Sequence, residues 1–312
     1  MTIKLGVSLP QTTDYDLATD ITDAARTAEK IGYDSVWAFE RVLLPHDQSG
    51  AHGLYGVPDL PWPALYGIVS DPLITLAMAA AVTSRVELGT GVLVAPLHLP
   101  VKLAKTLASL DHSSRGRVIA GLGSGWSVDE FAATAPRPIA ERGAALDEFL
   151  DVAAAVWGPN PVAVNTGRYR IDPADVNPKP ARPMPVYLAG SNRTAFRRIA
   201  RRADGWLPTG ISSAETVAGL AQIRQLAEEE GRDPAQIRCV YQIGLVAPLV
   251  EVPEGDRKPF TGSAGQLAAD IAELAEGGVD HVYATLPYVV RDRNEYYDRL
   301  AEFHASVRET VA

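Results

Sequence analysis

The sequence contains a single cysteine, Cys239, among 312 residues. One thiol cannot form an internal disulfide, and its scarcity fits the reducing cytoplasm, where we expect this protein. Long apolar runs are also missing, because no stretch approaches the roughly 20 apolar residues that a membrane span needs. The start, MTIKLGVSLP, lacks the charged leader and cleavage site of a signal peptide, and we predict a first strand there.

Positive charge is scarce, with 29 Lys and Arg against 38 Asp and Glu and a formal net charge of −9. We therefore expect neither a nucleic-acid nor a membrane partner, because both surfaces are anionic. The six histidines show no zinc-type pairing, so no metal site is predicted. A Gly-x-Ser-x-Gly nucleophile elbow with triad partners is absent as well.

Short β-branched runs alternate with amphipathic stretches of helical period. The strand-like runs span residues 3–9, 35–39, 86–92, 117–122, 185–190, 205–208, 238–246 and 281–286. Eight alternations favour a closed parallel (β/α)8 barrel, the TIM barrel, over an open doubly wound sheet. We predict one α/β domain over residues 1–312.

Three stretches rich in glycine and proline interrupt this alternation after strands 2, 4 and 7, at about residues 41–70, 158–184 and 247–262. The first and third follow strands, which places them at the carboxyl face, where long loops build active sites. The middle one contains VAVNTGRYRI, whose alternation around Thr166-Gly167 predicts a small hairpin.

The glycine-rich stretch GLGSGW, residues 121–126, follows the fourth predicted strand. Its Gly-x-Gly-x-Gly spacing brings the last glycine one residue too early for a dinucleotide fingerprint. Two interpretations stay open: the glycines merely turn the chain, or their bare amides approach an anion or a ring. Similarly, the glycines of ELGTGV, residues 87–92, indicate either a strand distortion or close approach by a flat ring.

A phosphate site is predicted where the strand PVYLAG ends at Gly190. Ser191 or Asn192 can cap the next helix, whose first-turn amides carry the positive end of the helix dipole. The alternative is an ordinary capped helix with its cationic side chains in solvent. Those side chains are Arg197, Arg198, Arg201 and Arg202. Two predicted strands therefore end in glycines at the same face of the barrel, near residues 121–126 and at Gly190. This favours one phosphorylated cofactor that contacts both strand ends.

The order GVSLP, AEKIGYDSVWAFER, ELGTGVLVAPLHLPVKLAKTLASLDHSSRGRVIAGLGSGW and PVYLAGSNRTAFRRIARRADGWLP resembles the luciferase-like monooxygenase superfamily. In particular, it is similar to the actinobacterial branch that uses the deazaflavin coenzyme F420. The likeness runs from Lys4 to about Leu300. It implies a (β/α)8 barrel that holds the cofactor ring across its carboxyl-end mouth, a small-molecule substrate and a homodimer.

The resemblance also implies site residues. Thr90, Gly91 and Val92 would form a bulge behind the central ring, with a cis peptide between Gly91 and Val92. The other predicted cofactor-binding residues are Glu40, Gly123, Ser124, Gly125, Asp129, Ala189, Gly190, Ser191 and Thr209.

Glu40 and Arg41 are the predicted catalytic residues. Glu40 lies where relatives carry an acidic residue near the pyrimidine or hydroxyl edge of the deazaflavin. Arg41 stands where sugar-phosphate dehydrogenases of the family have a catalytic histidine, and Trp126 stands where they have a glutamate acid. We therefore do not transfer that acid–base pair, and we predict that Trp126 and Trp62 wall the substrate pocket.

The leading hypothesis is an F420-dependent oxidoreductase that transfers a hydride between the deazaflavin and a small organic substrate, as a reductase. One alternative is an FMN-dependent monooxygenase, for which a separate flavin-reducing enzyme is an expected partner. Another is a non-catalytic cofactor-binding barrel. The aromatic residues Tyr55, Trp62 and Tyr66 fit an apolar or ring-shaped substrate, or else they cover the barrel core.

Overall fold

The computed structural model describes residues 3–311 and confirms the predicted (β/α)8 barrel. The barrel strands are β1 (Lys4–Ser8), β2 (Ser35–Ala38), β3 (Glu87–Thr90), β4 (Leu93–Val94), β5 (Val118–Gly123), β8 (Val186–Leu188), β9 (Gly205–Trp206), β10 (Arg238–Ile243) and β11 (His281–Ala284). They run in the order β3-β2-β1-β11-β10-β9-β8-β5, and the pairing of β3 with β5 closes the ring. An open sheet is therefore excluded.

The third barrel strand consists of two pieces, β3 and β4, and both pair in parallel with β5. Leu88 and Gly89 of β3 lie beside Val118 and Ile119, whereas Leu93 and Val94 of β4 lie beside Leu122 and Gly123. Residues 91–92 interrupt the strand between these pieces. The predicted distortion is therefore a bulge near the carboxyl end of the third strand.

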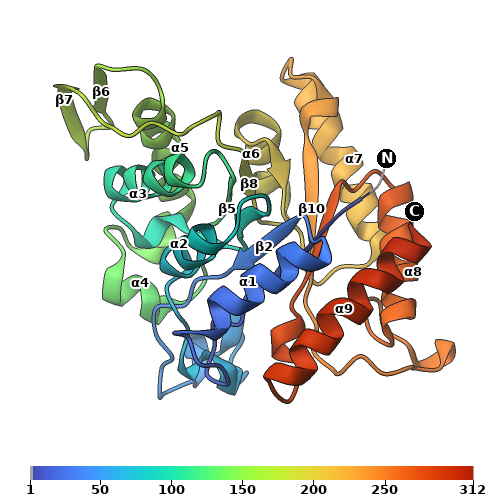
Figure 1. Cartoon of the computed structure of the whole chain (residues 1–312). Helices are drawn as coiled ribbons and strands as arrows, with labels where there is room; N and C mark the ends of the chain where they lie inside the picture. The colour runs from blue at the N-terminus through green and yellow to red at the C-terminus, as the bar shows by residue number, and fades with distance from the viewer. Residues whose placement is uncertain (1–2, 312) are drawn as a thin grey trace.

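Helices surround the barrel on the outside (Figure 1). They are α1 (Asp20–Ile31), α2 (Pro72–Val82), α3 (Pro100–Ser113), α4 (Val128–Thr134), α5 (Arg142–Trp157), α6 (Arg193–Arg202), α7 (Ser213–Glu229), α8 (Ala264–Glu276) and α9 (Arg293–Thr310). The terminal helix α9 packs against α8 and α1. Within residues 3–311, none of the helices has the length and apolar character that crossing a bilayer requires.

The middle insertion forms the predicted hairpin, with β6 (Val162–Asn165) antiparallel to β7 (Arg170–Ala174). At its turn, the Thr166 amide donates to the Tyr169 carbonyl over 3.0 Å, and Gly167 adopts a φ of 80°. Figure 1 shows the hairpin standing away from the barrel beyond α5. The regular structure of the other two insertions is limited to short 3-10 turns, such as Gly50–His52, Ala64–Gly67 and Glu254–Asp256, and a β-bridge between Val69 and Thr12.

Aromatic side chains fill the barrel interior and explain several strand glycines. Trp37 stacks on Tyr283 with ring centroids 4.3 Å apart. A Cβ atom on Gly89 would lie 2.3 Å from the Trp37 ring, and one on Gly91 would lie 2.0 Å from the Tyr283 hydroxyl. The sequence allowed a flat ring close to the glycines of ELGTGV. At Gly89 that ring is the side chain of Trp37. The His281 ring lies edge-on to Trp37, and burial lowers its pKa to about 3, so this histidine is neutral.

Candidate active site

The predicted site residues lie at or just beyond the carboxyl ends of neighbouring barrel strands. Glu40 and Arg41 follow β2, Thr90 ends β3, and Gly123 ends β5. The segments at residues 189–191 and at Thr209 follow β8 and β9. Because β3, β5, β8 and β9 are successive neighbours in the ring, their carboxyl ends share one rim.

The bulge at this rim is held from both sides by hydrogen bonds. The hydroxyl of Thr90 donates to the Gly121 carbonyl over 2.7 Å and accepts from the Gly121 amide over 2.9 Å. On the other side, the Gly91 amide donates to the Ala38 carbonyl over 2.8 Å. The peptide bond between Gly91 and Val92 is cis, as the resemblance implied.

The spacing of GLGSGW follows from the bulge beside it. An added Cβ on Gly121 would lie 1.9 Å from the Thr90 carbonyl oxygen, and one on Gly123 would lie 2.7 Å from Val92 Cγ2. At Gly125, whose φ is +77°, a Cβ would lie 2.6 Å from Val94 Cγ1. Alternate glycines therefore face alternate residues of the neighbouring strand. The glycines recur at every second residue because every second residue of a strand lies on the same face. Their spacing therefore reflects strand packing and not a phosphate-binding loop.

Glu40 joins the bulge to a residue that the sequence did not identify as part of the site, His98. The Glu40 amide donates to the Val92 carbonyl over 3.1 Å, and Glu40 Oε2 accepts from the Val94 amide over 2.6 Å. The other carboxylate oxygen, Oε1, lies 2.7 Å from His98 Nε2. Burial alone would lower the pKa of His98, but the hydrogen bond and charge of Glu40 raise it above its ordinary value.

Arg41, the residue after Glu40, forms a buried ion pair with Glu130. Arg41 Nη1 lies 3.0 Å from Glu130 Oε2, and the two side chains are only 10% and 3% exposed. Glu130 Oε1 also accepts from the Val42 amide over 2.7 Å. Burial raises the pKa of the Glu130 carboxyl above its usual value, although the Arg41 guanidinium opposes this shift. Arg41 and Glu130 therefore form a buried ion pair, not a surface one.

Aromatic residues surround the guanidinium of Arg41. Its Cζ atom lies 4.9 Å from the ring centroid of Trp126, 5.8 Å from that of Trp62 and 6.0 Å from that of Tyr66. Trp62 and Trp126 also contact each other, with centroids 4.7 Å apart. The structure therefore brings the two predicted pocket residues together, at the base of the first insertion.

Asp129 links this insertion to the start of α4. Its Oδ1 lies 2.9 Å from Nδ1 of His52, while its Oδ2 is buried and has no hydrogen-bond partner. The backbone carbonyl of His52 in turn accepts from Trp62 Nε1 over 2.8 Å. One carboxylate oxygen of Asp129 is thus left without a hydrogen-bond partner.

The predicted phosphate site is the start of α6. Asn192 is the N-cap, and its side chain accepts from the Ala195 amide over 2.9 Å. Gly190 has a φ of +138°, and its carbonyl accepts from Trp206 Nε1 over 2.8 Å. Three of the five arginines on α6 form ion pairs rather than standing free in solvent. These pairs are Arg198 with Asp147, Arg201 with Glu230, and Arg202 with Asp151.

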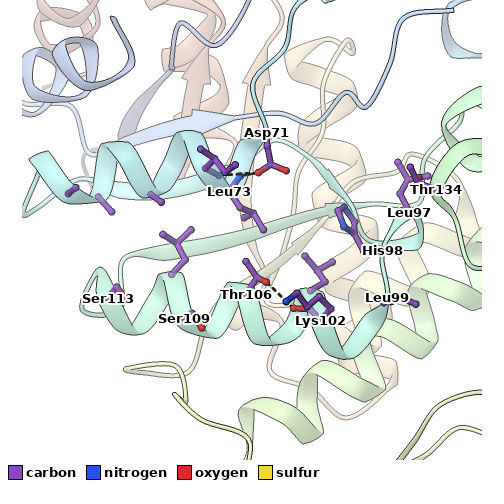
Figure 2. Close-up of a pocket in the computed structure, with 16 residues that line it drawn as sticks. Asp71, Leu73, Leu97, His98, Leu99, Lys102, Thr106, Ser109, Ser113 and Thr134 are labelled. Atoms are coloured by element: carbon purple, nitrogen blue, oxygen red, sulfur yellow. Dashed lines mark hydrogen bonds between the residues drawn. The ribbon is translucent and has the colours of Figure 1, made fainter. Parts of the chain in front are cut away.

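His98 lines two large cavities and a third, much smaller one of about 10 Å³. One, of about 790 Å³, lies between α2 and α3, outside the barrel (Figure 2). The other, of about 380 Å³, is lined by Glu40, Arg41 and Val42. Both are lined by Asp71, Leu97, His98 and Thr134. Within residues 3–311, no cluster of His, Cys, Asp and Glu could hold a metal ion.

Sequence reasoning missed His98 and Glu130. His98 is 58 residues from Glu40, and Glu130 is 89 residues from Arg41. Neither His98 nor Glu130 shares a sequence motif with its partner. The two contacts therefore arise only in the folded barrel. Only one feature of the sequence could have pointed to Glu130. It lies four residues after Trp126, in the helix α4 that follows the carboxyl end of β5.

Comparison with known proteins identifies the family. Residues 3–247 match the model of the luciferase-like monooxygenase family. An uncharacterized protein of Mycobacterium tuberculosis is 32% identical over 263 residues, 80% of this chain and 93% of that protein. The F420-dependent hydroxymycolic acid dehydrogenase of the same species is 30% identical over 261 residues, 82% of this chain and 63% of that protein.

The same architecture occurs in solved structures. An F420-dependent secondary alcohol dehydrogenase, in complex with an F420-acetone adduct, superposes with a TM-score of 0.78 at 18% identity. The match covers 99% of this chain and 100% of that one. By the family model and the fold together, this chain belongs to the luciferase-like monooxygenase family.

Proposed function

We propose that this protein is an F420-dependent oxidoreductase that transfers a hydride between the deazaflavin coenzyme and a small organic substrate, in the reductive direction. As a member of its family, the chain is an oxidoreductase. The F420-dependent dehydrogenases among its relatives support the choice of cofactor. The observation that carries the proposal is the bulge at Gly91-Val92, flanked by bare glycines on β5 and by Glu40 on β2.

The residues at the rim fit a phosphorylated ring cofactor. Asp129 Oδ2 is buried without a partner and can accept a hydrogen bond from the cofactor's side chain. At the start of α6, Asn192 caps only the Ala195 amide, which leaves the first amides of the helix and the Ser191 hydroxyl for a phosphate. No acidic residue stands in that first turn. An anion is therefore favoured there.

We assign the roles at the rim as follows. Thr90, Gly91 and Val92 would support the ring, and Gly123, Ser124, Gly125 and Asp129 would line its side chain. Ala189, Gly190, Ser191 and Thr209 would hold the phosphate. When bound, the deazaflavin would supply the hydride, and the hydride chemistry belongs to the cofactor.

The chain itself would shape the substrate pocket. The first insertion brings Trp62 against Trp126 and places both near the Arg41 guanidinium. This surface suits an apolar or ring-shaped substrate with one hydrogen-bond acceptor for Arg41. Closure by the insertion would exclude water from the reacting groups.

Single-turnover spectroscopy tests the proposal. Under anaerobic conditions, the protein is mixed with reduced F420 and a panel of small enones, imines and ketones. We expect absorbance of oxidised F420 to appear with at least one substrate class, at a rate above that of the protein-free mixture. Absence of reoxidation across the panel, despite tight cofactor binding, would support the non-catalytic barrel.

An FMN-dependent monooxygenase is the second candidate, favoured by the activity after which the family is named. It predicts oxygen consumption with reduced FMN and a flavin-reducing partner enzyme. The F420 proposal predicts turnover without oxygen, so an oxygen electrode separates the two candidates. We also propose a cytoplasmic homodimer, and light scattering of the purified protein tests its mass.

Ser191→Asp should weaken cofactor binding by about tenfold or more, because it places a negative charge at the phosphate site on the N-terminal side of α6. Calorimetric titration measures the loss. The matched control is Ser263→Asp, which adds the same charge as N-cap of α8, where aspartate caps as well as serine. Equal affinities of the two variants would contradict the phosphate assignment.

A further inference from the structure

His98 stands between the bulge and the outside of the barrel. Its Nε2 faces the buried Glu40, whose side chain is 4% exposed, while the imidazole as a whole is 29% exposed. Figure 2 shows His98 at the end of the cavity between α2 and α3, near Asp71 and Leu97. Protons from solvent therefore reach this imidazole without passing through the barrel mouth.

Glu40 forms hydrogen bonds to the backbone at two points after Gly91. Its amide donates to the carbonyl of Val92 over 3.1 Å, and its Oε2 accepts from the amide of Val94 over 2.6 Å. Both partners lie in the segment that directly follows Gly91. A change in the position or charge of the Glu40 carboxylate is thus transmitted to the backbone at Val92 and Val94.

We propose that His98 is a positioning residue that holds the bulge in place through Glu40, and that its protonation state sets the affinity for the cofactor. The proposal rests on the proposed function only in assuming that the bulge supports the cofactor ring. His98 itself need not touch the cofactor or the substrate.

Charged groups around His98 determine the direction of the effect. Glu40 contacts the imidazole directly, Asp71 at the start of α2 adds a second negative charge, and Lys102 of α3 lines the same cavity. On another side, His98 lines a small cavity with Arg137 and Glu148, which form an ion pair with each other over 2.6 Å. Arg41 and Glu130 lie behind Glu40 as an ion pair. The two carboxylates together raise the pKa of His98, so the protonated form is the one that binds Glu40 strongly.

The sign of the pH effect follows from that raised pKa. The histidine–carboxylate pair contributes fully at pH values below the ordinary pKa of histidine, and its contribution is lost as pH rises through the raised value. We therefore expect the bulge to be held most firmly in mildly acidic solution and to loosen in alkaline solution.

The first test uses the ligand-free protein and NMR. In the wild type, the amide resonance of Val94 should titrate together with the His98 ring, with one shared midpoint above the ordinary pKa. In His98→Gln, whose amide can donate to Glu40 at every pH, that titration should disappear. His112→Gln, a substitution of an exposed histidine near the end of α3, is the control and should leave it unchanged. If Val94 does not follow His98 in the wild type, the proposal is wrong.

The second test measures cofactor affinity against pH. If cofactor binding raises the pKa of His98 by one unit, the wild-type Kd should increase about tenfold as pH rises through the midpoint. In His98→Gln the Kd should be independent of pH over the same range, whereas His112→Gln should follow the wild type. A pH dependence that persists in His98→Gln would overturn the proposal. If no cofactor binds at any pH, the proposed function fails, and the NMR result still decides the link between His98 and the bulge.

Discussion

Gly121→Ala should lower the free energy of unfolding by about 3 kcal/mol, the upper part of the range for overpacked sites. An added Cβ would lie 1.9 Å from the Thr90 carbonyl oxygen and 2.8 Å from Leu207 Cδ1. The first of these contacts is backbone in a closed barrel, so it cannot be relieved by rotating a side chain. Moving β5 away would also break the two hydrogen bonds between Gly121 and the Thr90 hydroxyl.

Urea unfolding followed by circular dichroism measures this loss. Gly255→Ala is the matched control, because a Cβ there meets nothing within 4 Å and the backbone has no left-handed φ. We expect the control to lie within about 0.5 kcal/mol of the wild type, as surface substitutions usually do. If Gly121→Ala is as stable as Gly255→Ala, the close approach of β3 and β5 is not as described.

Arg41→Met should destabilise the protein by about 3 to 5 kcal/mol at neutral pH, because it leaves the buried Glu130 carboxylate without its partner. The double variant Arg41→Met/Glu130→Gln should recover most of this loss, since the glutamine carries no charge and can still accept from the Val42 amide. Arg291→Met, which breaks an exposed pair with Glu295, should cost at most about 0.5 kcal/mol.

The pH dependence of the Arg41→Met deficit provides a second check. The guanidinium opposes the upward shift in the pKa of Glu130, so its removal lets the buried carboxyl take up a proton more readily. The deficit relative to the wild type should therefore shrink as pH falls. Unfolding at a mildly acidic and a mildly alkaline pH measures it, and a deficit that grows on acidification would contradict the buried ion pair.

The barrel could be predicted because its strands and most of its helices carry clear periodic signals. Helix α2 carries no such signal, and its sequence PLITLAMAAAV shows why. It is apolar on nearly every face, with Ile74 61% exposed and Leu76 fully buried, so no amphipathic period marks it as a helix. Helix α4 was missed because seven residues are too few to show a period.

The site could be predicted only in part, because contacts across the barrel leave no trace in local spacing. Glu40 and Arg41 were predicted as site residues, but the sequence did not reveal His98 and Glu130 as their partners. The sequence left open whether the glycines of GLGSGW turn the chain or let an anion or a ring approach. What approaches them in the structure is the neighbouring strand at Thr90, Val92 and Val94.

Calorimetric titration of the purified protein with F420 and, separately, with FMN tests the central claim most directly. The claim is that the rim formed by β3, β5, β8 and β9 binds a deazaflavin. We predict saturable heat with F420 at one site per chain, weakened in Ser191→Asp and preserved in Ser263→Asp. Saturable heat with FMN alone, or no heat with either cofactor, would contradict it.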